Sequence, residues 1–202
     1  IEVGIGMVAD LKEKGYNVLA TGEMGIGNTT TSSAVCSVLL DQSVEKVTGK
    51  GAGLTNKDLE HKIEVIRQSI ALNKVNADDP LDVLAKVGGL DIAGMAGCYI
   101  GGAALNIPVF IDGFISSVAA LIAIRLVPEC APYLFPSHCS NEPAGRMILD
   151  AIGKQPYILA NMCLGEGTGA VMGFTIADYA FKAYWELPSF EQTNFGTYEE
   201  LN

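Results

Sequence analysis

A glycine-rich segment near the start of the chain, GEMGIGNTT at residues 22–30, constrains the fold more than any other feature. A short apolar run precedes it at residues 16–21, and residues 34–40 after it are apolar at helical spacing. A strand, a glycine turn and a helix start together direct free backbone N–H groups and the positive end of a helix dipole at an anion. We therefore expect an α/β unit with an anion site at this turn. The alternative is a glycine-rich turn that only packs tightly.

The residues inside this loop argue against one common kind of anion site. The segment from Gly22 to Thr29 has the spacing of a phosphate-binding P-loop, but Asn28 stands where that loop carries its lysine. Glu23 also lies in the loop, where its carboxylate would repel a polyphosphate. A P-loop nucleotidase is therefore disfavoured. The loop suits a ligand with an anionic end and a positively charged centre.

The composition indicates a compact, buried fold and excludes several partners. Of the 202 residues, 49% are hydrophobic and only 18% are charged, which is unlike a disordered chain. A formal net charge of −10 argues against a nucleic-acid surface. The most apolar stretch, residues 107–127, contains Asp112 and Arg125, so we expect no membrane span. Five cysteines without a C-x-x-C spacing favour free thiols in a cytoplasmic protein.

Apolar runs alternate with helical patterns along the chain. Strands are predicted at residues 16–21, 44–47, 108–111 and 133–135, and helices at 1–14, 29–41, 55–73, 80–87, 116–127, 144–152 and 171–183. Residues 90–105 form an apolar segment rich in glycine and alanine that can pack closely against neighbours. This alternation predicts one α/β domain over residues 1–202, with a mostly parallel sheet flanked by helices in a Rossmann-like three-layer arrangement. Residues 184–202 are expected to form a surface tail or a partner contact.

A second glycine turn, residues 49–53, is followed by a predicted helix that carries Lys62 near its start. Lys62 lies at the edge of the apolar face of this helix, so its ammonium group could reach back to an anion held by the turn. The alternative is a lysine that extends past apolar neighbours to reach water.

Three carboxylates stand out by their surroundings. Asp91 is the only charge in its apolar segment, and it either caps a helix start or faces a ligand. Asp112 directly follows a predicted strand, and ligands bind beyond the carboxyl ends of strands in open parallel sheets. Glu166 lies between two glycines in an otherwise apolar turn, which could raise its pKa and make it a general base. Alternatively, Glu166 only favours the helix N-terminus that follows.

Six ordered motifs resemble those of the nicotinate-nucleotide–dimethylbenzimidazole phosphoribosyltransferase family, which makes the lower-ligand nucleotide of cobalamin. Any one of them alone would be a weak signal, but the six in order are specific and extend over nearly the whole chain. They are GEMGIGNTT at 22–30, the glycine turn at 49–54 with Lys62 after it, VGGLDIAGMAG at 87–97, VFIDGF at 109–114, SHCSNEP at 137–143 and LGEGTGA at 164–170.

The resemblance implies transfer of 5-phosphoribose from nicotinate mononucleotide to a nitrogen of a benzimidazole-type base. The products would be nicotinate and α-ribazole 5′-phosphate, with inversion at the anomeric carbon. By resemblance, Glu166 is the general base and Glu23 is a second catalytic carboxylate at the reaction centre. No cofactor or metal is implied, because the leaving group is already a pyridinium. The expected substrate-binding residues are Gly25, Gly27, Asn28, Gly51, Gly53, Lys62, Asp91, Asp112, Ser140, Gly165 and Gly167.

The chain departs from the family pattern in two respects. Ala52 stands where a threonine is common between the glycines of the second turn. Family members are also longer, with an N-terminal region that helps to form the base pocket and packs in a homodimer. Two hypotheses follow: an active, dimeric enzyme, or a truncated, non-catalytic nucleotide-binding paralogue or subunit that needs a second chain to complete the base pocket.

Overall fold

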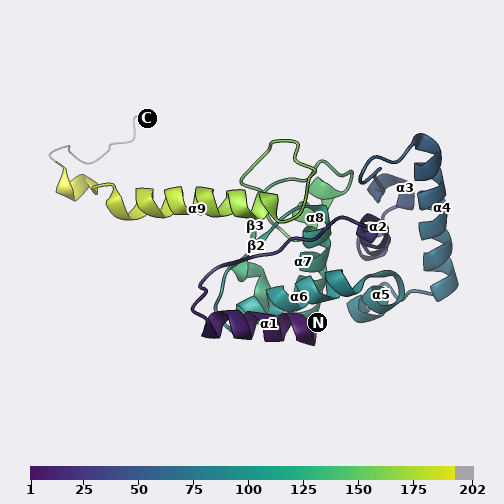
Figure 1. Ribbon diagram of the computed structural model, residues 1–202, viewed down its shortest axis with the longest axis horizontal. Helices are drawn as coiled ribbons and strands as arrows, with labels where there is room; N and C mark the ends of the chain where they lie inside the picture. Colours follow the sequence, from purple (N-terminus) through teal and green to yellow (C-terminus); the bar gives the residue numbers. More distant parts are fainter. Residues whose placement is uncertain (194–202) are drawn as a thin grey trace, which may run out of the picture.

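The computed structural model describes residues 1–193, which fold as helices around a small parallel sheet (Figure 1). The three strands, β1 (Leu19–Ala20), β2 (Val109–Ile111) and β3 (Leu134–Pro136), are all parallel and lie in the order β1-β2-β3. This confirms the predicted α/β fold with a parallel sheet, although each strand is only two or three residues long. The helices are α1 (Glu2–Glu13), α2 (Asn28–Leu39), α3 (Val44–Val47), α4 (Asn56–Asn73), α5 (Pro80–Val87), α6 (Leu90–Ala104), α7 (Phe114–Leu126), α8 (Gly145–Ala151) and α9 (Thr168–Glu186), with 3-10 turns η1 (Pro128–Tyr133) and η2 (Phe190–Gln192).

Helices cover both faces of the middle strand β2. Val109 packs against α6, where a Cβ added to Gly102 would lie 2.5 Å from its Cγ2 atom. The next side chain, Phe110, meets the ring of Phe174 on α9 edge-on at a centroid distance of 5.0 Å. Since successive strand residues point to opposite faces, α6 and α9 lie on opposite sides of the sheet. Beyond the sheet, α9 extends away from the rest of the molecule (Figure 1).

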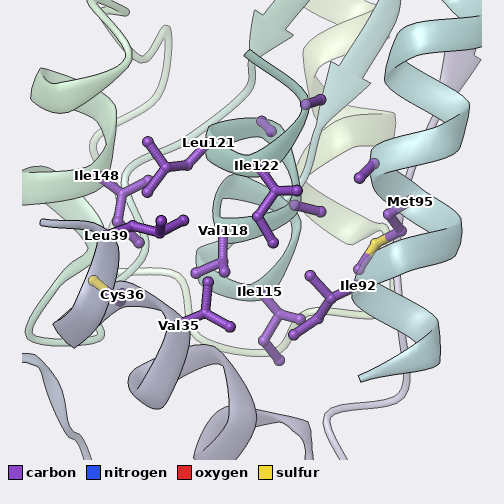
Figure 2. Packing of buried hydrophobic residues seen from close by; sticks show 14 of the residues in the cluster. Val35, Cys36, Leu39, Ile92, Met95, Ile115, Val118, Leu121, Ile122 and Ile148 are labelled. Carbon is purple, nitrogen blue, oxygen red and sulfur yellow. The ribbon is translucent and has the colours of Figure 1, made fainter. Parts of the chain in front are cut away.

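Helix α7 is the centre of the hydrophobic core. Its residues 114–123 are all buried, as expected for a helix that is apolar on every side. Figure 2 shows Val118 and its neighbours on α7 surrounded by Val35 from α2, Ile92 from α6 and Ile148 from α8. The core therefore lies beside the sheet and fixes α2, α6 and α8 relative to the strand-end loops.

The glycine-rich segment at residues 90–105 forms α6 and packs closely against α1, as its composition predicted. A Cβ on Gly4 would lie 2.7 Å from the backbone nitrogen of Cys98, and one on Gly101 would lie 3.0 Å from the Cα atom of Ile5. Only glycine allows the two helix backbones to approach so closely.

The predicted strand at residues 44–47 is wrong, because this segment is the short helix α3. Val44 and Val47 are both buried, and a spacing of three residues places them on the same side of a helix but on opposite faces of a strand. The predicted surface tail at 184–202 lies partly outside the described residues; within them, Tyr184, Trp185 and Phe190 are exposed. None of the described helices has both the length and the apolar character needed to cross a membrane.

Candidate active site

The loop between β1 and α2 depends on glycines with positive φ. Gly25 has φ +71° and Gly27, the N-cap residue of α2, has φ +77°. Within residues 1–193, no side chain caps the start of α2. Its first-turn N–H groups therefore remain without a side-chain partner, which is what an anion site at a helix N-terminus requires.

Asn28 connects two carboxylates in this loop. Its Nδ2 atom donates to Glu23 Oε2 at 2.8 Å and to Asp91 Oδ2 at 2.8 Å. The backbone N–H of Gly25 donates to the same Glu23 oxygen at 2.6 Å. Asn28, which stands where a P-loop carries its lysine, thus hydrogen-bonds two carboxylates of the protein itself. Asp91 lies in the first turn of α6, which agrees with the expectation of a carboxylate at a helix start. Its expected contact with a ligand stays a prediction.

Asp112 is fully buried directly after β2, at the strand end where the sequence predicts it. Its carboxylate accepts hydrogen bonds from the backbone N–H groups of Gly167 at 2.9 Å, Gly169 at 2.8 Å and Ala170 at 3.3 Å. Asp112 therefore holds the N-terminal end of α9 by hydrogen bonds to its backbone.

Glu166 belongs to a strained turn at this helix start. It has φ +57°, between Gly165 at +76° and Gly167 at +77°. Its backbone N–H donates to the carbonyl oxygen of Glu23 at 3.1 Å, so the turn is joined to the first glycine loop. The Glu166 side chain is exposed, and the apolar enclosure expected for this carboxylate is not present within residues 1–193.

Lys62 is buried and directed inward, so the alternative in which it extends to water is wrong. Only 7% of the residue is exposed, and its Nζ atom donates to Thr29 Oγ1 and to the carbonyl oxygen of Gly49, each at 3.0 Å. Burial lowers the pKa of Lys62, while the charge of Glu142 acts in the opposite direction. The lysine therefore joins the start of α2 to the second glycine turn, which contributes Gly51 beside Thr29.

These loops enclose a cleft of about 510 Å³. Six of the predicted site residues line it: Glu23, Gly25, Gly51, Ser140, Gly165 and Glu166. The other predicted residues, Gly27, Asn28, Gly53, Lys62, Asp91, Asp112 and Gly167, are absent from the lining as the structure describes it. Of these, Asn28 holds Glu23 and Lys62 holds Thr29, and both of these partners line the cleft. Asp112 holds the start of α9, next to Glu166.

The cleft residues that the sequence did not predict include two with shifted pKa values, Glu142 and His138. Glu142 and His138 belong to the same strand-end motif as Ser140, so the position of this motif after a strand was the available signal. His138 is only 2% exposed, and burial lowers its pKa, opposed by the charge of Asp112. Burial raises the pKa of Glu142, opposed by Lys62 and by a hydrogen bond from the backbone of Gly51.

A larger groove of about 710 Å³ lies along α1, α5 and α6. Its lining is mainly apolar, and Glu2 is its only ionisable side chain within the described part of the chain. Chemistry that needs several polar groups therefore belongs to the smaller cleft.

Comparison with known proteins gives the class of the chain. Residues 1–195 match the family DBI_PRT, described as "Phosphoribosyltransferase". The chain belongs to this family.

Individual relatives carry a more specific name. The chain is 54% identical over 201 residues to a nicotinate-nucleotide–dimethylbenzimidazole phosphoribosyltransferase of Ruminiclostridium cellulolyticum, and 50% identical over 199 residues to one of Acetivibrio thermocellus. These matches cover 100% and 98% of the chain. The crystal structure of CobT from Thermus thermophilus superimposes with a TM-score of 0.87 at 33% identity, covering 94% of this chain and 56% of that one. The chain spans 57% of the length of these two curated relatives.

Proposed function

We propose that this chain carries the reaction centre of a phosphoribosyltransferase that moves 5-phosphoribose from nicotinate mononucleotide to a benzimidazole-type base. One observation carries the proposal: Glu23 and Glu166 line the same cleft as Gly51, behind which Lys62 is buried. Carboxylates suit the positively charged pyridinium and sugar, whereas the lysine and glycine turn suit the phosphate.

The two carboxylates have different surroundings and therefore different proposed roles. Glu23 accepts two hydrogen bonds from its own loop, which hold its side chain in place, and we assign it to the side of the sugar. In the reaction, the bond from C1′ to the nicotinate nitrogen breaks, and its electron pair neutralises the pyridinium. A benzimidazole nitrogen forms the new bond to C1′, and its other nitrogen loses a proton. The exposed Glu166 is free to accept that proton as the general base.

The phosphate end relies on backbone as well as side-chain donors. The first turn of α2 has no side-chain cap within the described residues, and Lys62 Nζ donates a hydrogen bond to Thr29 in that turn. Ser140 and Gly51 also line the cleft, and we assign the ribose to this part of the lining. These positions support the substrate-binding roles that the sequence predicts for the two glycine turns.

Turnover measurements test the proposal. The purified chain is incubated with nicotinate mononucleotide and dimethylbenzimidazole, and nicotinate and the riboside phosphate are followed by chromatography. Glu166→Gln should lower the rate about 10²–10⁴-fold, the usual contribution of a general base, with nicotinate mononucleotide binding unchanged. Glu60→Gln, a matched change at an exposed position of α4, serves as control. A Glu166→Gln rate within twofold of this control would refute the catalytic role.

A second candidate is a nucleotide-binding module that needs a partner for turnover. Three apolar side chains at the cleft, those of Met24, Ile26 and Leu164, are 67%, 83% and 68% exposed, so the described residues supply little apolar wall for an aromatic base. Nicotinate mononucleotide binding without product would favour this candidate.

We further propose a homodimer, or a second chain, that completes the base pocket. Helix α9, which begins at the candidate site, exposes large apolar side chains, including Val171, Tyr179 and Phe181. Light scattering coupled to size exclusion would give the oligomeric state, and a monomer at assay concentration would refute the homodimer.

The five free cysteines support a cytoplasmic location, since oxidising compartments favour disulfides.

A further inference from the structure

Glu142 lines the cleft together with Gly51 and Thr29. Its backbone is held in a turn, because its N–H donates to Ser140 Oγ at 3.3 Å and its carbonyl oxygen accepts from Gly145 at 2.8 Å. The side chain extends toward the second glycine turn. A Cβ added to Gly49 would collide with Glu142 Oε2 and would lie 2.7 Å from Pro143 Cδ. Glycine at position 49 thus leaves room for this carboxylate.

Glu142 interacts with groups that the proposed function assigns to the phosphate. Burial raises the pKa of Glu142, whereas the charge of Lys62 and a hydrogen bond from the backbone of Gly51 lower it. In return, Glu142 opposes the lowering of the Lys62 pKa. The same lysine donates to Thr29 Oγ1 and to the carbonyl oxygen of Gly49, the residue against which Glu142 Oε2 packs.

A phosphate and an ionised Glu142 cannot share these donors, because two anions at contact distance repel each other strongly in a partly buried site. We propose that Glu142 is a specificity-determining residue whose carboxylate substitutes for the phosphate in the free protein and is displaced when the ligand enters. This inference rests on the proposed function. The displaced carboxylate makes the cleft selective, since only an anion that binds Lys62 and Gly51 better than Glu142 can enter.

The arrangement makes Glu142 a competitor of the ligand phosphate. Replacing it by glutamine keeps the side-chain size and a hydrogen-bond acceptor for Gly51 but removes the charge. Nicotinate mononucleotide should then bind about tenfold more tightly, whereas nicotinate riboside, which lacks the phosphate, should bind with unchanged affinity. The preference for the phosphorylated ligand would rise by the same factor.

Titration calorimetry at pH 7.5 and low salt tests this with the wild-type chain, Glu142→Gln and the exposed control Glu60→Gln. Folding of each variant is checked by its thermal unfolding midpoint. Tighter binding of the mononucleotide by Glu142→Gln alone supports the proposal. Unchanged affinity for the mononucleotide would overturn it. Weaker binding would also overturn it, and would show instead that Glu142 binds the ligand, for example through a ribose hydroxyl.

A second variant separates this proposal from the proposed function. Lys62→Gln should weaken mononucleotide binding in both the wild-type and the Glu142→Gln background, because the phosphate loses its cation in either case. If no protein in the series binds the mononucleotide, the proposed function fails and the role of Glu142 fails with it. If the wild type binds the mononucleotide and Glu142→Gln gives no gain, only the role of Glu142 fails.

Discussion

Replacement of Asp112 by asparagine should destabilise the protein more than any other single change at the site that removes only a charge. Asp112 is fully buried, and one carboxylate oxygen accepts from Gly169 and Ala170 while the other accepts from Gly167. An asparagine oxygen can replace only one of these acceptors, so its amide N–H groups would face the N–H of Gly167. Hydrogen bonds to a charged group contribute about 1.5–3 kcal/mol, so we expect a loss of about 2–4 kcal/mol in the free energy of unfolding.

Urea denaturation followed by circular dichroism measures this loss. With a slope of about 2 kcal/mol/M, the midpoint should fall by about 1–2 M. Asp150→Asn is the matched control, because Asp150 is exposed and pairs at 2.8 Å with Arg146 on the surface of α8, where an ion pair contributes about 0–1 kcal/mol. A midpoint for Asp112→Asn equal to that of Asp150→Asn would refute the reasoning that Asp112 anchors α9.

Three further changes test other parts of the site by thermal or urea unfolding. Gly169→Ala should lower the free energy of unfolding by about 1–3 kcal/mol, because the added Cβ would collide with the buried His138 ring. The control Gly94→Ala places its Cβ where no atom lies within 4 Å, so it should be neutral or stabilising. Equal effects of the two changes would contradict the packing at the start of α9. Asn28→Asp should lower both the free energy of unfolding and the affinity for nicotinate mononucleotide, because it places a third carboxylate between those of Glu23 and Asp91, which Asn28 now bridges. Burial lowers the pKa of His138, so near pH 6.5 the unfolded chain takes up a proton that the folded chain does not. The free energy of unfolding should therefore fall as the pH drops below about 6.5. His138→Gln should reduce this pH dependence, and a stability profile identical to that of the wild type would contradict the prediction.

The sequence predicted those parts of the fold that depend on local patterns. The apolar run at residues 108–111 forms β2, and the helix predicted at 80–87 is α5, whose N-cap Asp79 accepts from the backbone of Leu81 at 2.9 Å. The segment at 44–47 was misread because four residues fit either a short strand or one helical turn. The spacing of its two valines, which distinguishes the two, gains meaning only when both are known to be buried.

The site was predicted as a set of loops, but its contacts were not. Asn28 and Asp91 are 63 residues apart, and no sequence pattern predicts that one amide joins Asp91 to Glu23. Glu166 was expected to be enclosed because its neighbours in the sequence are apolar. Leu164 instead points outward and is 68% exposed, since the turn passes through three left-handed residues. Glu142 was missed because its significance depends on Lys62, which approaches from α4, 80 residues earlier in the chain.

The cleft is lined by negatively charged side chains, and a lysine lies behind them. Its described lining includes the carboxylates of Glu23, Glu142 and Glu166 and no lysine or arginine, while Lys62 lies behind the glycine turn. Such a cleft repels an ordinary polyanion and favours a ligand with one phosphate and a separate positive centre. In the proposed reaction, the ring loses its positive charge when its bond to C1′ breaks, and its attraction to Glu23 weakens. The proposed function therefore has Glu23 face a charged ring before transfer and an uncharged ring nitrogen after it, which favours release of nicotinate. In the proposed role of Glu142, its carboxylate returns toward Lys62 once the phosphorylated product departs.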